Sequence, residues 1–163
     1  MAGTQQGRTV AVLGLGMIGG SLAHALRHSG FAGRILAYDR DRAALETGLA
    51  RGTIDAACSD LAAVLAAELV IIAAPNLAAA ELLSQLLALL DDRPGPVITD
   101  VASVKGNLAA RAGGAARYVP GHPIAGSERS GVAAADGGLF AGHRVIQTAA
   151  PTQEPAAGEA RPE

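Results

Sequence analysis

The sequence predicts an α/β protein with a doubly wound, mainly parallel sheet. Short apolar runs of strand length alternate with longer stretches of helical periodicity. A glycine-rich turn joins the first run to the first helical stretch. Hydrophobic residues make up 50% of the chain but aromatic residues only 2%, so the core must be aliphatic, which suits a parallel sheet covered on both faces. Repeated units of this kind imply right-handed crossovers.

The expected strands are short runs rich in Val, Ile and Leu. They cover residues 8–13, 34–38, 69–73, 96–100, 118–120 and 144–148. The expected helices cover residues 18–29, 41–51, 61–67, 77–90 and 104–112. Gly30 and Gly52 are placed to end the first two helices, and Asn76 is placed to cap the fourth. Residues 131–140 are rich in Ala and Gly and are expected to be irregular or weakly helical.

The glycine-rich turn G-L-G-M-I-G directly follows the first strand and directly precedes the first helix. In this context each glycine has a separate role: Gly14 allows the turn, Gly16 lets the backbone approach a pyrophosphate, and Gly19 lets helix and strand pack closely. Met17 and Ile18 stand at the helix N-terminus, where free N–H groups and a partial positive charge favour phosphate. The motif is typical of a Rossmann-type NAD(P)-binding domain; a glycine turn without a ligand is the alternative.

Asp39 ends the second expected strand, about twenty residues after Gly19, where the fingerprint places an acidic residue. A carboxylate there accepts hydrogen bonds from the ribose hydroxyls and repels a 2′-phosphate, so NAD is expected in preference to NADP. Arg40 and Arg42 follow at once, and a guanidinium group can pair with a phosphate. Both are equally compatible with solvated charges at a helix start.

The 163 residues correspond to about one domain. We expect a flexible N-terminus at residues 1–7 and a dinucleotide-binding domain at residues 8–149. Residues 150–163 contain three prolines and no apolar periodicity, which predicts a disordered tail or linker.

Composition excludes several partners. A net charge of −2 and few aromatic side chains argue against nucleic acid and against an anionic membrane surface. The apolar stretch 69–90 is interrupted by Pro75, Asn76 and Glu81, which argues against a transmembrane span. Cys58 is the only cysteine, and the N-terminus has no apolar signal segment, so a reducing, cytoplasmic location is expected.

Two later loops should open on the same edge of the sheet as the glycine turn, because each follows a strand. The first has the sequence D-V-A-S-V-K at residues 100–105, and the second has G-H-P-I-A-G-S-E at residues 121–128. Together with the glycine block at residues 14–23, they occur in an order and spacing that resemble the prephenate/arogenate dehydrogenase family. The resemblance covers about residues 8–149.

That family oxidises prephenate or arogenate, with loss of carbon dioxide, in tyrosine biosynthesis. The resemblance implies that His122 accepts a hydrogen bond from the ring hydroxyl and takes its proton, which suits an imidazole that is mostly neutral at cellular pH. Ser103 would bond the same hydroxyl or the nicotinamide amide. Ser127 and Glu128 would line the substrate side, with Glu128 as a gate or ion-pair partner.

The resemblance also places Ala74 and Pro75 against the cofactor. Ordinary structural roles stand beside these assignments. Ser103 is able to cap the helix that follows it, Lys105 is more often solvated than catalytic, and Asp100 is expected to organise its loop through backbone hydrogen bonds. His24 and His28 share a helical face but have no third ligand, so no metal site is expected.

Family members usually continue into a helical domain that closes the cleft, forms a homodimer and supplies an arginine for the substrate carboxylate. The chain ends where that domain would begin, so we expect the cofactor-binding half of such an enzyme, truncated or completed by another polypeptide and poorly active alone. Two alternatives are another NAD(P)-dependent dehydrogenase of the hydroxyacid or pyrroline-carboxylate reductase kind, and a non-catalytic NAD-binding remnant. The first does not explain the histidine block, and the second predicts tight cofactor binding without turnover.

Overall fold

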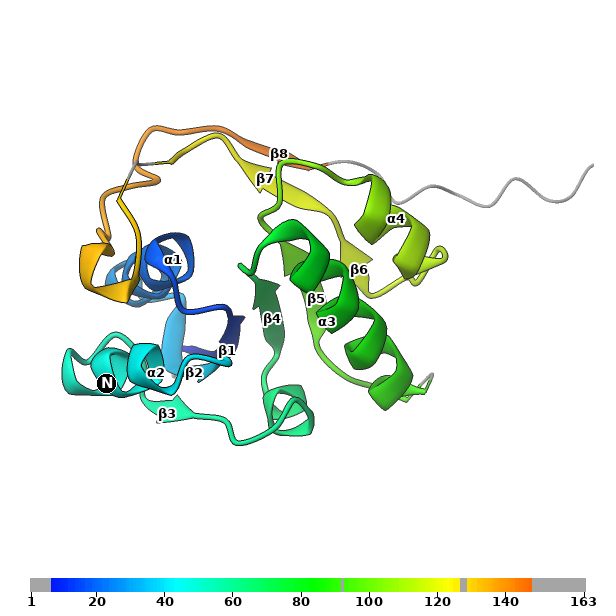
Figure 1. Ribbon diagram of the computed structural model, residues 1–163, viewed down its shortest axis with the longest axis horizontal. Coiled ribbons are helices and arrows are strands. Elements are labelled where there is room, and N and C mark those ends of the chain that lie inside the picture. The colour runs from blue at the N-terminus through cyan, green and yellow to red at the C-terminus, as the bar shows by residue number, and fades with distance from the viewer. Residues whose placement is uncertain (1–6, 92, 127–128, 148–163) are drawn as a thin grey trace, which may run out of the picture.

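Six parallel strands form the central sheet of the computed structural model (Figure 1). They are β1 (Arg8–Leu13), β2 (Ala32–Tyr38), β3 (Ala56–Ala57), β4 (Leu69–Ile72), β5 (Val97–Asp100) and β6 (Tyr118–Val119). Their spatial order is β3-β2-β1-β4-β5-β6, and every neighbouring pair is parallel. This is the strand order of doubly wound dinucleotide-binding folds, whose order reverses between β1 and β4. The predicted fold class is confirmed.

The structure describes residues 7–91, 93–126 and 129–147. The tail predicted at residues 150–163 and most of the N-terminal segment predicted as flexible lie outside these residues. The helices are α1 (Met17–His28), α2 (Arg42–Ala50), the 3-10 helix η1 (Ala62–Ala66), α3 (Asn76–Leu90), α4 (Gly106–Ala112) and the 3-10 helix η2 (Val132–Ala134). None of the helices in the described ranges is both long and apolar enough to cross a membrane.

Alternate residues of β1 face two separate hydrophobic cores, as the two-residue period of a strand requires. Val10 and Val12 pack with side chains from α1 and α2, whereas Ala11 and Leu13 pack with those from α3 and α4. All four side chains are fully buried. Figure 1 shows the corresponding arrangement, with α1 and α2 on one side of the sheet and α3 and α4 on the other. The sheet is therefore covered on both faces, as its aliphatic composition predicted.

A second, two-stranded sheet pairs β7 (Gly121–Pro123) antiparallel to β8 (Val145–Gln147). In Figure 1 it runs along the top of the view, and the segment between the two strands returns beside α1. That segment docks through the Asp136 N–H, which donates to the buried Ser21 Oγ at 2.9 Å. Gly20 leaves it room, since a Cβ there would lie 2.8 Å from Ala135 Cβ.

Several local details differ from the sequence-based predictions. His122 was placed in a loop but lies in β7, because that segment pairs with a distant strand. Asn76 is the first residue of α3, and Pro75 occupies the N-cap without a side-chain hydrogen bond. The short strand β3 was not expected. The predicted glycine stops are in place, since Gly30 and Gly52 have φ of 73° and 66° directly after the C-caps of α1 and α2.

Candidate active site at the carboxyl edge of the sheet

The glycine turn between β1 and α1 is dictated by steric contacts. Gly14 has a φ of 94°, and a Cβ there would lie 2.7 Å from Ala73 O on the neighbouring β4 loop. A Cβ on Gly19 would lie 2.0 Å from Gly14 O and 3.1 Å from the Val12 side chain. Gly14 and Gly19 therefore make the sharp turn and the close helix–strand packing that the motif predicted.

Gly16 differs from the other two glycines because a Cβ there would have no heavy atom within 4 Å. It is the N-cap of α1, in an extended conformation with no side-chain cap, and the first helical turn has no acidic residue. The basic residues of α1, Arg27 and His28, lie in its last turn. The helix thus presents an open, uncapped N-terminus of the kind that binds phosphate.

Asp39 connects the end of β2 to this turn. Its Oδ2 accepts a hydrogen bond of 2.6 Å from Leu15 N–H, and its Oδ1 accepts one of 2.8 Å from Asp41 N–H. A carboxylate has about four lone-pair sites. The two backbone bonds therefore fix its orientation and leave acceptor capacity for hydroxyl groups of a ligand.

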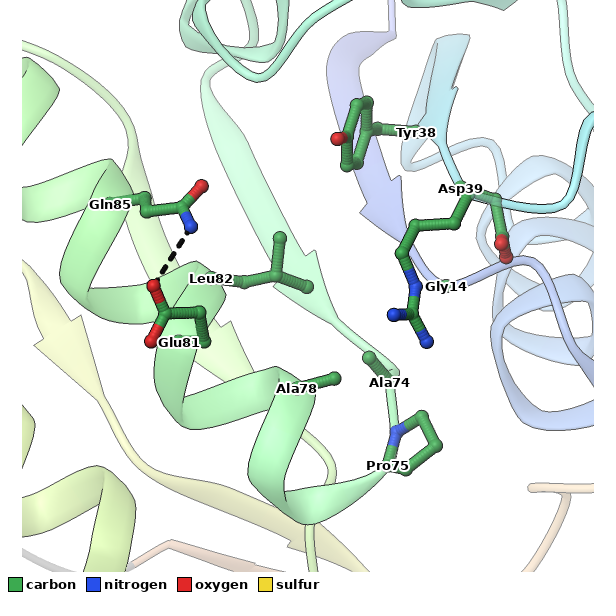
Figure 2. A pocket seen from close by; sticks show the side chains of 10 residues that line it. Gly14, Tyr38, Asp39, Ala74, Pro75, Ala78, Glu81, Leu82 and Gln85 are labelled. Carbon is green, nitrogen blue, oxygen red and sulfur yellow. Dashed lines mark hydrogen bonds between the residues drawn. The ribbon is translucent and has the colours of Figure 1, made fainter.

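A pocket of about 330 Å³ opens at the point where the strand order reverses. Figure 2 shows it between the side chains of α3 and the residues at the end of β2. Five residues predicted to bind a cofactor line it: Gly14, Asp39, Arg40, Ala74 and Pro75. The other lining residues are Tyr38, Ala78, Glu81, Leu82 and Gln85. None of these five was predicted, although residues 78, 81, 82 and 85 recur at helical spacing on α3.

The predicted residues Gly16, Met17, Ile18 and Gly19 are not among the lining residues; they form the N-cap and the start of α1, shortly after Gly14 in the chain. On the α3 side of the pocket, Gln85 Nε2 donates a 3.0 Å hydrogen bond to Glu81 Oε1 on the preceding turn of the helix (Figure 2). The site thus combines an apolar wall at Leu82 with polar atoms on both rims. This combination is usual for small-molecule sites.

A buried ionic cluster lies at the end of β5. Asp100, which is 1% exposed, accepts hydrogen bonds from Ala102 N–H at 2.8 Å and from the Tyr118 hydroxyl at 2.5 Å. Lys105 Nζ forms an ion pair with the same carboxylate and also donates to Gly121 O. Burial, together with the bond to Asp100 and its charge, raises the pKa of Tyr118 far above the usual 10. The phenol therefore remains a donor at neutral pH.

This cluster borders both candidate catalytic residues. Ser103 is exposed in the loop between β5 and α4, directly after Ala102, and His122 is half-buried in β7, directly after Gly121. His122 Nδ1 is buried and has no hydrogen-bond partner among the described residues. β5 lies two strands from β1, about 10 Å at the usual strand spacing. β1 and β5 are in one parallel sheet, and Gly121 lies against the end of β5, so the pocket and His122 are at the same, carboxyl edge of the sheet.

Comparison with known proteins identifies the family. The family model described as the nucleotide-binding domain of prephenate dehydrogenase matches residues 22–159. The chain belongs to this family. The matched range begins after the glycine turn, so the case for that turn rests on its own geometry.

Individual relatives agree with the family. The chain is 34% identical over 138 residues to the prephenate dehydrogenase of Lactococcus lactis, covering 82% of this chain and 38% of that protein. The crystal structure of A. aeolicus prephenate dehydrogenase in complex with hydroxyphenyl propionate and NAD+ has a TM-score of 0.77 and 34% identity, over 92% of this chain and 52% of that one. The crystal structure of Synechocystis arogenate dehydrogenase has a TM-score of 0.76 and 28% identity, over 90% of this chain and 52% of that one. The chain thus spans from 38% to 52% of these relatives' length.

Three sequence-based interpretations need revision or lie outside the described residues. Lys105 was expected to be solvated but is ion-paired, because the fold brings Asp100 and Gly121 O to its ammonium group. Ser103 does not cap α4, which starts later, at Gly106, with Lys105 as its N-cap. Ser127 and Glu128 lie outside the described residues. The expected backbone bond of Asp100 to its own loop is present.

His24 and His28 face one another on α1, with ring centroids 6.3 Å apart. His24 Nε2 lies 3.2 Å from Thr53 Oγ1, and His28 Nδ1 lies 2.9 Å from His24 O. Burial and the neighbouring cations, His28 first, lower the pKa of His24. Among residues 7–91, 93–126 and 129–147, no group of three or more His, Cys, Asp and Glu side chains is placed to hold a metal ion.

Proposed function

We propose that the chain is the cofactor-binding half of an NAD-dependent prephenate or arogenate dehydrogenase. The observation that carries this proposal is the common edge: the open N-terminus of α1, the pocket at Asp39 and the strand that bears His122 all lie where the parallel strands end. Ligands of open α/β sheets bind at this edge. The family match and the relatives' names support the same activity.

The residues at the pocket fit a dinucleotide. Gly16 leaves open space at the helix N-terminus for a diphosphate, and Met17, Ile18 and Gly19 begin that helix. Asp39 is held in place for ribose hydroxyls, and its negative charge disfavours a 2′-phosphate. Arg40, Ala74 and Pro75 line the same pocket. The relative from A. aeolicus was crystallised with NAD+, which supports NAD here.

NAD, when bound, supplies the hydride acceptor. In the proposed reaction the imidazole of His122 accepts the proton of the substrate ring hydroxyl as hydride leaves the same carbon, so a carbonyl forms there. The ring then loses its carboxylate as carbon dioxide, and the electron pair of the broken bond completes the aromatic ring. His122 returns its proton to the phenolate oxygen. Ser103 hydrogen-bonds the hydroxyl or the nicotinamide amide and keeps the reacting groups aligned.

The proposal extends to parts of the enzyme beyond the described residues. Ser127 and Glu128 are proposed to line the substrate side. A helical domain is proposed to supply an arginine for the substrate carboxylate and to form the homodimer. The chain spans 38% of its Lactococcus lactis relative, so the helical domain, its arginine and the homodimer are proposed from the family rather than from this structure. Prephenate and arogenate both remain candidate substrates, because the relatives include enzymes named for each.

Two measurements test the proposal. Calorimetric titration of the chain with NAD should give a dissociation constant in the micromolar range or weaker, about −8 kcal/mol at best. NADH formation should then depend on prephenate or arogenate once the chain is extended with the C-terminal part of the Lactococcus lactis relative. The chain by itself should turn over little or not at all, because the arginine proposed to bind the substrate carboxylate belongs to the helical domain. A charge-assisted contact of that kind contributes about 2–5 kcal/mol.

The His122→Asn variant of the extended protein should lose turnover by about 10²–10⁴-fold, because the proton acceptor is removed. His143→Asn is the matched control, since His143 is exposed and outside the candidate site. An unchanged rate in His122→Asn would exclude His122 from the mechanism. NAD binding without turnover in the extended protein would support a non-catalytic nucleotide-binding domain instead.

A further inference from the structure

Lys105 is the single lysine among the 13 lysine and arginine residues of the chain. Its side chain is 20% exposed and its ammonium nitrogen reaches two acceptors, the Asp100 carboxylate and Gly121 O. An ammonium group is a compact charge with three donors on a flexible stem, so it can serve acceptors in two directions. The planar guanidinium of arginine presents its donors in one rigid fork. This position therefore has a geometric reason to be lysine in a chain that otherwise uses arginine.

The partner carboxylate is fully desolvated. The Asp100 side chain is 0% exposed and has three donors: Ala102 N–H, the Tyr118 hydroxyl and Lys105. A buried charge of this kind is tolerated only when it is paired and hydrogen-bonded. The cluster therefore couples the end of β5, the strand β6 and the loop before α4 into one arrangement.

Both candidate catalytic residues are adjacent to this cluster in the sequence. Ala102, which donates to Asp100, directly precedes Ser103, and Gly121, which accepts from Lys105, directly precedes His122. β7 also packs closely against β5. A Cβ on Gly121 would lie 3.0 Å from Asp100 O and 3.1 Å from Thr99 Oγ1. The two residues occur on separate segments, and the hydrogen bond from Lys105 Nζ to Gly121 O joins the segments.

We propose that Lys105 is a positioning residue, which together with Asp100 locks the His122 strand to the Ser103 loop and so sets the gap that holds the substrate hydroxyl. The proposal rests on the function proposed above. It assigns Lys105 no contact with substrate or cofactor, since its ammonium group is directed at Asp100 and Gly121. A misplacement of about 1 Å at a reacting group costs on the order of 100-fold in rate.

Nuclear magnetic resonance on the chain itself gives the first test. With ¹⁵N-labelled lysine, Lys105 should give one ammonium signal that exchanges slowly with water, and Asp100→Asn should broaden it. With ¹⁵N-labelled histidine, Lys105→Met should shift the ring signals of His122 and leave those of His24, His28 and His143 in place. Arg111→Met, which removes a cation from α4, is the matched control and should move none of the four.

Because Lys105→Met leaves a buried carboxylate without its cation, the double variant Asp100→Asn/Lys105→Met is made as well. It removes both charges together, and it should show the same shift of His122. Unmoved His122 signals in a folded single or double variant would overturn the proposal, as would an ammonium signal that exchanges at the rate of a free lysine.

Kinetics of the extended protein give the second test. Lys105→Met should lower kcat by about tenfold or more and change the KM for NAD by less than about threefold, because Lys105 does not line the nucleotide pocket. Lys105→Arg keeps the charge and should not restore kcat. A fall in kcat accompanied by an equally large rise in the KM for NAD would indicate a merely structural role. If the extended protein without substitutions forms no NADH with either prephenate or arogenate, the proposed function fails. The histidine signals of the chain itself still decide the role of Lys105.

Discussion

Asp39 Oδ2 accepts a 2.6 Å hydrogen bond from the backbone N–H of Leu15. The bond joins the end of β2 to the middle of the glycine turn, across 24 positions of sequence. Asp39 therefore has two effects that are usually discussed separately. It holds the turn that presents the N-terminus of α1, and it contributes a carboxylate to the pocket beside that turn.

Replacing Asp39 with Asn should weaken NAD binding about tenfold to a hundredfold. An amide has one acceptor oxygen, so it cannot accept from both backbone N–H groups and also from the ribose, which is the role proposed for the carboxylate. A hydrogen bond to a charged group is worth about 1.5–3 kcal/mol. Loss of the negative charge should also reduce discrimination against NADP. Calorimetric titration with both dinucleotides measures the two effects.

Glu46→Gln is the control for Asp39→Asn, because it removes one negative charge from the exposed surface of α2. It should leave both affinities within about twofold, since an exposed charge contributes little. If the two variants bind NAD equally well, the ribose assignment of Asp39 is wrong.

Gly16 and Gly19 form a matched pair for separating binding from stability. Gly19→Ala places a Cβ 2.0 Å from Gly14 O, so helix and strand must move apart, at a cost of about 1–3 kcal/mol or more. Gly16→Ala meets no atom within 4 Å and starts from a φ of −85°, which any residue adopts. We expect Gly19→Ala to lower Tm by about 4 °C or more and Gly16→Ala by less than about 2 °C.

For NAD affinity the expectation for Gly16→Ala is a clear loss, because the new methyl group enters the space in which a diphosphate would lie. Thermal unfolding with and without NAD measures both quantities. Unchanged NAD affinity in Gly16→Ala would mean that the open space at this glycine is not the diphosphate site.

Tyr118 should make stability depend on pH in the alkaline range. Its pKa is raised by burial and by Asp100, so the folded chain keeps the phenol proton while the unfolded chain loses it above pH 10. The stabilisation is complete below pH 10 and decreases as the pH rises further, by about 1.4 kcal/mol per unit at most.

Urea unfolding between pH 8 and 11 should therefore show a steep alkaline loss in the natural chain and a shallower one in Tyr118→Phe. The variant should also be less stable at neutral pH by about 1.5–3 kcal/mol, since Asp100 loses a buried donor. Tyr38→Phe is the control, because it removes the other tyrosine and leaves the Asp100 cluster intact. Equal alkaline slopes in all three proteins would contradict the prediction.

The sequence by itself determined the alternation of strands and helices, the parallel sheet and the glycine turn. These features depend on local information, namely apolar periodicity, strand length and the position of glycines. Gly14, Gly30 and Gly52 adopt positive φ, which glycine does readily. The spacing between Gly19 and Asp39 was equally readable, because one strand–helix–strand unit of standard length separates the two. Family membership followed from three local blocks of sequence.

The tertiary structure alone decided which distant groups meet. β7 pairs with β8 after an excursion beside α1, so the conformation of His122 depends on Ile146, its partner in register. From the sequence, Lys105 is expected to be a solvated surface residue. Only the folded structure shows that its ammonium group contacts Asp100 and Gly121 O. Glu81, Leu82 and Gln85 read as ordinary positions of an apolar helix until α3 is set against β2. Apart from the contact between Lys105 and Asp100, which are five residues apart, these contacts join residues distant in the sequence, and no local preference of the backbone specifies them.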